Sequence, residues 1–110
     1  MTKSERITMQ KAINETVEVA RANALTELTA MQEPDVTRLR SCRAYVITTT
    51  GYYILQSYRT IVAVIDRETG ACYDFLRTAF GYTSTSAQHI AKFRSDYSDW
   101  HAKTYRAYPV

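Results

Sequence analysis

The chain has 110 residues, of which 45% are hydrophobic and 23% are charged, and its formal net charge is +3. This length predicts one domain spanning residues 1–110, and the composition excludes intrinsic disorder. The charged first residues exclude a secretory signal peptide, and no apolar run is long enough to cross a membrane. We therefore expect a cytoplasmic protein that makes no membrane contact and keeps Cys42 and Cys72 as free thiols.

The charge is unevenly distributed along the chain. Residues 1–36 hold four basic and six acidic residues and residues 37–110 hold ten basic and five acidic ones, so −2 and +5 give the net +3. Eight of those ten basic residues are arginine, and the chain has nine tyrosines. Both residue types are enriched in surfaces that recognise other macromolecules. The composition therefore favours a binding protein.

Residues 1–33 are predicted to form one long helix. Thr2 and Glu5 have the spacing of a capping box, and Pro34 ends the segment. The apolar residues between them recur at the helical period and are Ile13, Val17, Ala20, Ala24, Leu28 and Met31. A helix of this length spans roughly 40 Å, which is long for so small a domain. We expect part of it to project from the body or to pair with a second copy in a homodimer.

A four-stranded sheet is predicted between residues 44 and 76, after a basic linker over residues 34–43. Its segments of β-branched and aromatic residues are 44–50, 52–58, 60–66 and 71–76. The third segment is apolar on both faces, which indicates a central strand. Gly51 and Gly70 mark turns. Short loops between consecutive strands favour an antiparallel meander.

The last predicted element is a helix over residues 84–104. Thr85, with Gln88 three residues later, has the spacing of a helix cap. An apolar stripe predicts that this helix packs on the sheet, and it consists of Ile90, Phe93, Tyr97 and Trp100. The expected fold is therefore α+β in the order α-β-β-β-β-α, with a long N-terminal helix, a four-stranded antiparallel meander and a C-terminal helix on the sheet.

Catalytic residues are not evident in the sequence. His89 and His101 are twelve residues apart on one predicted helix, about 18 Å by helical rise, so they cannot share a metal or a substrate. Asp96 and Asp99 suit either a hydrated cation or, more simply, a solvated helix face. Cys72 is a thiolate candidate beside His89 or a small core residue. We predict no enzyme, no metal and no cofactor.

Nucleic acid is one candidate partner. The polar start of the last helix, followed by basic residues, is compatible with a recognition helix carrying Gln88, Lys92 and Arg94. Helix capping and core packing explain the same pattern. A sheet face with several tyrosines could also stack bases, or those tyrosines could cover the core with their hydroxyls at its rim. They are Tyr45, Tyr53, Tyr58 and Tyr73.

A protein is the other candidate partner. Arginines cluster before the first predicted strand and near strand ends, where they form either a binding surface or a solvated rim. The acidic N-terminal segment is an alternative docking face, because acidic surfaces can occupy nucleic-acid channels by mimicry. The predicted partner-binding residues are Arg38, Arg40, Arg43, Arg59, Arg77, Tyr53 and Tyr58.

Two segments carry a resemblance to known proteins. Residues 53–66 read Y-x-L-x-S-Y-x-T-x-V-A-x-I-D, and residues 85–93 read T-S-x-Q-H-I-x-K-F. Together they resemble a group of small phage and plasmid proteins of unassigned function, over roughly residues 52–93. Some small proteins of this kind from mobile elements are anti-CRISPR proteins that inhibit type II RNA-guided nucleases. The resemblance implies this function and transfers no site residue.

The leading hypothesis is a phage or mobile-element inhibitor that acts in the host bacterial cytoplasm. It would bind a host defence protein, in the sharpest version a type II CRISPR nuclease, and block it sterically. The alternative is a small nucleic-acid-binding phage regulator. A structural protein that assembles through the long helix is the third possibility.

Overall fold

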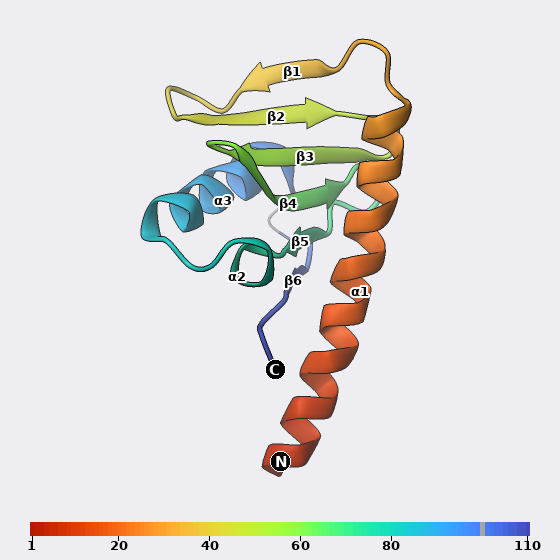
Figure 1. Ribbon diagram of the computed structural model, residues 1–110, viewed down its shortest axis with the longest axis vertical. Helices are drawn as coiled ribbons and strands as arrows, with labels where there is room; N and C mark the ends of the chain where they lie inside the picture. The colour runs from red at the N-terminus through yellow and green to blue at the C-terminus, as the bar shows by residue number, and fades with distance from the viewer. Residues whose placement is uncertain (100) are drawn as a thin grey trace.

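The N-terminal helix α1 spans Lys3–Ala30 in the computed structural model, which describes residues 1–99 and 101–110. The predicted cap is confirmed, since the Thr2 side chain accepts a hydrogen bond from the Glu5 N–H at 3.1 Å. The predicted apolar face is confirmed too, because Val17, Ala20 and Ala24 are buried. Figure 1 shows that the N-terminal end of α1 extends past the sheet, and residues 1–9 are exposed.

The sheet has six strands rather than the predicted four. The strands lie in chain order, from β1 at one edge to β6 at the other. Strands β2 to β5 correspond to the predicted antiparallel meander, and β1 extends it at one edge. Strand β6 pairs with β5 in parallel, so the sheet is mixed. The strand bounds are Asp35–Arg38 (β1), Ala44–Thr48 (β2), Tyr52–Ser57 (β3), Thr60–Asp66 (β4), Cys72–Asp74 (β5) and Thr104–Arg106 (β6).

The linker predicted over residues 34–43 was wrong, because it contains β1. All four residues of β1 are exposed, so the strand has no apolar alternation to reveal it. It forms because its backbone pairs with β2, and Leu39 N–H donates to the Ala44 carbonyl at 2.8 Å beyond its end. A strand held by ladder hydrogen bonds alone leaves no hydrophobic pattern in the sequence.

The predicted C-terminal helix over residues 84–104 was too long. Helix α3 spans Ser84–Tyr97, and the chain then returns to the sheet as β6. Its cap is Thr83 and not Thr85, since the Thr83 side chain accepts from the Ser86 N–H at 3.2 Å. A short helix α2, Leu76–Ala79, precedes it. Ile90 and Phe93 are buried as predicted, whereas Trp100 lies outside the described residues.

The two long helices cover opposite faces of the sheet (Figure 1). Helix α1 packs Val17 and Ala24 against Ile54 and Val64. Helix α3 packs Ile90 and Phe93 on the other face. Strand β4 is therefore central, as its two apolar faces predicted. Helix α1 lies mainly along β4, β5 and β6, and Ile47 of β2 joins the same cluster.

The two turns at the ends of β2 and β4 depend on glycine in different ways. Gly51 N–H donates to Glu27 Oε1 at 2.7 Å, and a Cβ at Gly51 would lie only 2.9 Å from Glu27 Oε2. This close approach joins α1 to the β2–β3 turn. Gly70 has φ of +77°, the left-handed conformation expected of the turn glycine.

The two edges of the sheet differ. At the β6 edge, Gln10 donates to the Arg106 carbonyl at 3.0 Å. Asn14 pairs with the Tyr108 backbone in both directions, at 2.7 and 3.1 Å, as a neighbouring strand would. At the β1 edge, the backbone N–H and C=O groups of Val36 and Arg38 point away from β2, because hydrogen-bonded and non-hydrogen-bonded pairs alternate in an antiparallel ladder. None of the helices within the described residues combines the length and apolar character needed to cross a membrane.

Candidate functional site

The two segments that carry the sequence resemblance meet in space. Ser57 ends β3, and its Oγ lies 2.9 Å from Ser86 Oγ and 2.7 Å from His89 Nδ1 on α3. All three side chains are buried. Burial lowers the pKa of His89, and the positive charge of Lys92 lowers it further, so the imidazole is neutral at pH 7. This buried polar cluster joins the β3–β4 turn to the first turns of α3.

Tyr58 begins the β3–β4 turn in a conformation that bulky residues rarely adopt. Its φ is +55°, in the left-handed region, which costs roughly 1–2 kcal/mol for a residue with a Cβ. Its ring lies 5.7 Å from the His89 ring and 48% of the residue is exposed. Such strain recurs at functional sites more often than elsewhere. The turn therefore presents a large aromatic side chain in a fixed position.

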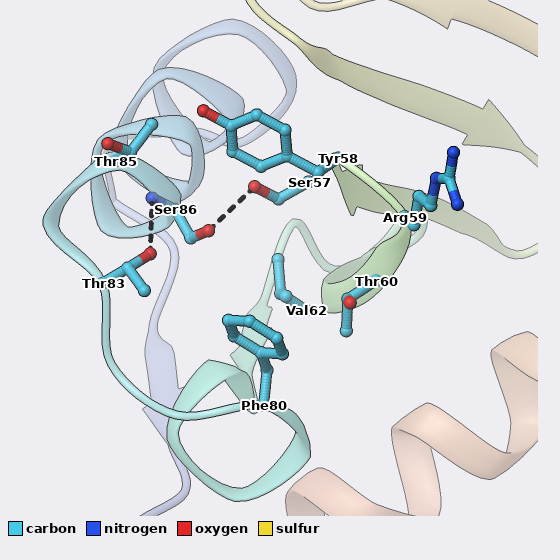
Figure 2. Close-up of a pocket in the computed structure, with 9 residues that line it drawn as sticks. All are labelled: Ser57, Tyr58, Arg59, Thr60, Val62, Phe80, Thr83, Thr85 and Ser86. Atoms are coloured by element: carbon cyan, nitrogen blue, oxygen red, sulfur yellow. Dashed lines mark hydrogen bonds between the residues drawn. The ribbon is translucent and has the colours of Figure 1, made fainter.

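A cavity of about 510 Å³ opens beside this turn. Figure 2 shows the Phe80 ring directed toward Val62 at the floor, with Tyr58 on the far side and the start of α3 closing the cavity. Phe80 is 65% exposed, an unusual position for a large apolar side chain. We name this cavity the turn pocket, and its lining residues are Ser57, Tyr58, Arg59, Thr60, Val62, Phe80, Thr83, Thr85 and Ser86.

An arginine-rich hollow lies on the other side of the same turn. The sheet register places Arg38 opposite Tyr45, and Tyr58 N–H donates to the Arg43 carbonyl at 2.9 Å, which brings the two turns together. In Figure 2 the Arg59 side chain points away from the turn pocket. We name this surface the arginine hollow, and its residues, all exposed, are Arg38, Arg43, Tyr45, Tyr58 and Arg59.

The positive charges of the arginine hollow are not neutralised by the protein. Among the described residues, no carboxylate lies within 4.0 Å of the guanidinium groups of Arg38, Arg43 or Arg59. Arg38 is held in place by the β1–β2 turn, where it donates to the carbonyls of Cys42 at 2.9 Å and Ser41 at 3.3 Å. The hollow thus holds a concentrated positive charge beside two exposed tyrosines.

Three other predicted partner-binding residues lie elsewhere. Arg40 makes a two-pronged ion pair with Asp96, at 2.7 and 2.9 Å, and this contact lowers the pKa of Asp96. Arg77 stacks on the rings of Tyr82 and Tyr108, at 4.8 and 5.0 Å. Tyr53 lies against Tyr97 at 4.9 Å on the face that α3 covers. Each of these side chains already has an internal contact.

The predicted nucleic-acid residues do not share one helix face. Gln88 is exposed, and Lys92, one turn later, donates to Cys42 Sγ at 3.3 Å. Arg94 is two residues beyond Lys92 and therefore about 200° around the helix. Its charge acts instead on Cys72 in β5. The three side chains cannot enter one groove together.

The tyrosines proposed to share a sheet face do not do so either. Tyr45 and Tyr73 lie on the face that carries α1, where Tyr73 stacks on Tyr105 with ring centroids 5.3 Å apart. Tyr53 lies on the opposite face, and Tyr58 belongs to the turn. The sheet therefore offers no continuous tyrosine platform for stacking bases.

Cys72 and His89, considered from the sequence as a thiolate pair, are not hydrogen-bonded to each other. Burial raises the pKa of Cys72 to about 12, so its thiol stays protonated and is no nucleophile. His89 is hydrogen-bonded to Ser57 and not to a cysteine. In the part of the chain that the structure describes, no group of three His, Cys, Asp or Glu side chains gathers to hold a metal ion.

Sequence reasoning missed two parts of the site. Phe80 lies in the loop between α2 and α3, outside any periodic pattern, although the exposed pair Phe80 and Tyr82 around Gly81 was a usable signal. Tyr45 was considered for stacking bases and not as a neighbour of Arg38. That contact depends on β1, which the sequence did not predict.

The comparisons with known proteins place the chain in a family. Neither the curated proteins nor the solved structures contain a match. One family model, the family of unknown function DUF8033, matches residues 26–107, which include the turn pocket and the arginine hollow. Because the match spans most of the chain, the protein belongs to this family of unknown function.

Proposed function

We propose that this protein is an inhibitor from a phage or mobile element that binds a host defence protein and blocks it sterically. A type II RNA-guided nuclease is the sharpest candidate for that partner, on the resemblance of residues 53–66 and 85–93. The observation that carries the proposal is the arginine hollow, where Arg38, Arg43 and Arg59 have no acidic partner within the described residues. Arginine and tyrosine together are typical of binding hot spots.

The charge of the hollow favours an acidic partner surface. Guanidinium groups without an acidic partner inside the protein can form charge-assisted hydrogen bonds to the carboxylates of another protein. Helix α1 is a weaker docking candidate, because its four basic and four acidic residues balance and give it no net acidic character to imitate nucleic acid. Inhibition would therefore act through a surface of the nuclease outside its positively charged nucleic-acid channel.

The test measures binding of the purified protein to a type II nuclease, with and without guide RNA, together with cleavage of target DNA. We expect tight binding and loss of cleavage. Arg59→Glu should weaken binding at least tenfold, because it places a negative charge in the hollow. Arg6→Glu is the matched control, since it changes the net charge equally on the exposed start of α1.

Two results would remove this proposal. One is the absence of binding to the nuclease in both states. The other is an equal loss of affinity in Arg59→Glu and Arg6→Glu, which would mean that total charge and not the arginine hollow determines binding.

A small nucleic-acid-binding regulator is the second candidate. The same guanidinium groups, which have no acidic partner among the described residues, suit phosphate oxygens, and the exposed Tyr45 and Tyr58 could stack on bases. Affinity for labelled DNA or RNA should then fall steeply as salt is added. If no duplex or single strand binds at low salt, this candidate is excluded.

Pairing of two copies through α1 is a separate proposal. Met9, on the projecting turns of the helix, is an apolar residue that is 52% exposed. Light scattering should give the mass of a dimer for the full chain and of a monomer after Met9→Glu. A monomeric wild-type protein at high concentration would contradict it.

A further inference from the structure

The turn pocket and the arginine hollow share a wall. Tyr58 and Arg59 line both, and they separate an apolar cavity from a positively charged one. Figure 2 shows Tyr58 directed toward the pocket and the start of α3, whereas Arg59 points to the opposite side of the turn. A chain lying across the turn would therefore meet an apolar cavity on one side and guanidinium groups on the other.

The floor and walls of the turn pocket suit an apolar side chain. Val62 is 1% exposed at the floor, and the rings of Phe80 and Tyr58 form the walls. The two buried polar residues of the lining, Ser57 and Ser86, are already hydrogen-bonded to each other, and Ser57 Oγ also contacts His89 Nδ1 behind them. They are not available to read the edge of a nucleobase, which needs fixed donors and acceptors.

The other half of the surface suits carboxylates. Arg38, Arg43 and Arg59 lie around the hollow next to the pocket, and no acidic side chain of the described residues neutralises them. Charge complementarity therefore identifies an acidic ligand. An apolar anchor flanked by acidic residues is a combination that a protein segment supplies and a nucleic acid does not.

We propose that this surface binds an acidic segment of the partner protein, with one large apolar side chain in the turn pocket and neighbouring carboxylates in the arginine hollow. This inference rests on the proposed function, because it assumes that the partner is a protein. It adds the chemical class of the recognised segment. The strained Tyr58 fixes the wall between the two cavities, so that the anchor and the acidic residues keep a constant spacing.

The probe is a library of random linear peptides displayed on phage and selected on the full-length protein. We expect the enriched peptides to share one large apolar residue with aspartate or glutamate close by in the sequence. Affinity is then measured with a labelled synthetic copy of the consensus peptide. Phe80→Ala should weaken it about tenfold, which corresponds to about 1.4 kcal/mol, and Arg43→Glu should weaken it at least as much.

The controls separate a folding defect from a binding defect. Phe80 is 65% exposed, so Phe80→Ala should leave the unfolding midpoint nearly unchanged. Arg6→Glu changes the net charge as Arg43→Glu does, far from the hollow, and should keep full affinity for the peptide. A consensus without acidic residues, or equal affinity in wild type and Phe80→Ala, would overturn the inference. So would single-stranded DNA that competes with the peptide for the same surface.

The outcome also distinguishes this inference from the proposed function. If the nuclease binds wild type and Phe80→Ala equally, the nuclease proposal stands and the pocket inference is wrong. If the acidic consensus appears but the nuclease does not bind, the pocket inference stands and the partner is a different acidic protein.

Discussion

The β6 edge and the β3–β4 turn use charged residues in opposite ways. At the β6 edge, buried Asp74 accepts hydrogen bonds from Arg106 at 3.0 Å and from the Leu76 N–H at 3.1 Å. At the turn, three guanidinium groups of the arginine hollow have no acidic partner among the described residues. Internally satisfied charge stabilises the fold, whereas unsatisfied surface charge is available to a partner. Substitutions at the β6 edge should therefore change stability, whereas substitutions in the arginine hollow should change binding.

The largest expected effect is on stability at the β6 edge. Asp74→Ala should lower the free energy of unfolding by about 2–3 kcal/mol, because it leaves the Leu76 N–H buried without an acceptor and removes the partner of Arg106. Urea denaturation measures this loss. Asp96→Ala is the matched control, and it should change stability little because its ion pair with Arg40 is exposed. Equal losses would contradict the distinction between a buried and an exposed carboxylate.

The buried cluster beneath the turn should give the next largest effect. Ser57→Ala removes the partner of both Ser86 Oγ and His89 Nδ1 and should cost about 1–2 kcal/mol. Ser41→Ala, in the exposed β1–β2 turn, should cost almost nothing. Denaturation of the two variants side by side is the measurement. An unchanged midpoint in Ser57→Ala would mean that the hydrogen bonds of this cluster do not stabilise the turn.

The elements predicted correctly from the sequence are those that bury a periodic apolar face. Val17, Ala20 and Ala24 repeat at the helical period, and β4 is apolar on both sides because helices cover both. Strand β1 is exposed along its whole length and β6 has only three residues. Both edge strands depend on backbone hydrogen bonds to a neighbour, and such bonds leave no side-chain pattern.

The candidate site was only partly predictable for a related reason. The sequence placed Ser57 at a strand end and His89 on the last helix, but their hydrogen bond joins residues 32 positions apart. Contacts of this kind follow from packing and not from local pattern. Arg38, Arg43 and Arg59 line one hollow in the structure, whereas Arg40 and Arg77, which the sequence offered as equal candidates, contact Asp96 and Tyr82 instead.

Removing the backbone strain at Tyr58 in the β3–β4 turn should stabilise the protein. Tyr58→Asn should raise the free energy of unfolding by about 0.5–1 kcal/mol, because asparagine tolerates positive φ better than tyrosine. The same variant should bind the partner more weakly, since the wall of both cavities is lost. Tyr45→Asn, in the extended backbone of β2, is the control and should show no gain. A stability loss in Tyr58→Asn would show that ring packing outweighs the strain.

The pH dependence of stability should report on His89. Burial lowers the pKa of His89 in the folded state, so the unfolded chain binds the proton more readily. Stability is therefore complete above the unfolded pKa of about 6.5 and falls as the pH drops below it. Urea denaturation midpoints measured above and below this pH give the size of the effect. His89→Asn should reduce the difference between the two midpoints. The same difference in wild type and His89→Asn would assign the effect to other groups.

The smallest expected effect concerns the chemical reactivity of the two thiols, Cys72 and Cys42. Cys72 in β5 is fully buried with a pKa raised to about 12, so it should react with an aromatic disulfide reagent only after unfolding. Cys42 is only half-buried in the β1–β2 turn, where its Sγ accepts from Lys92 Nζ at 3.3 Å, so its thiol should react in the native protein. Counting the thiols that react before and after the addition of urea measures this difference. Two reactive thiols in the native protein would contradict the burial of Cys72.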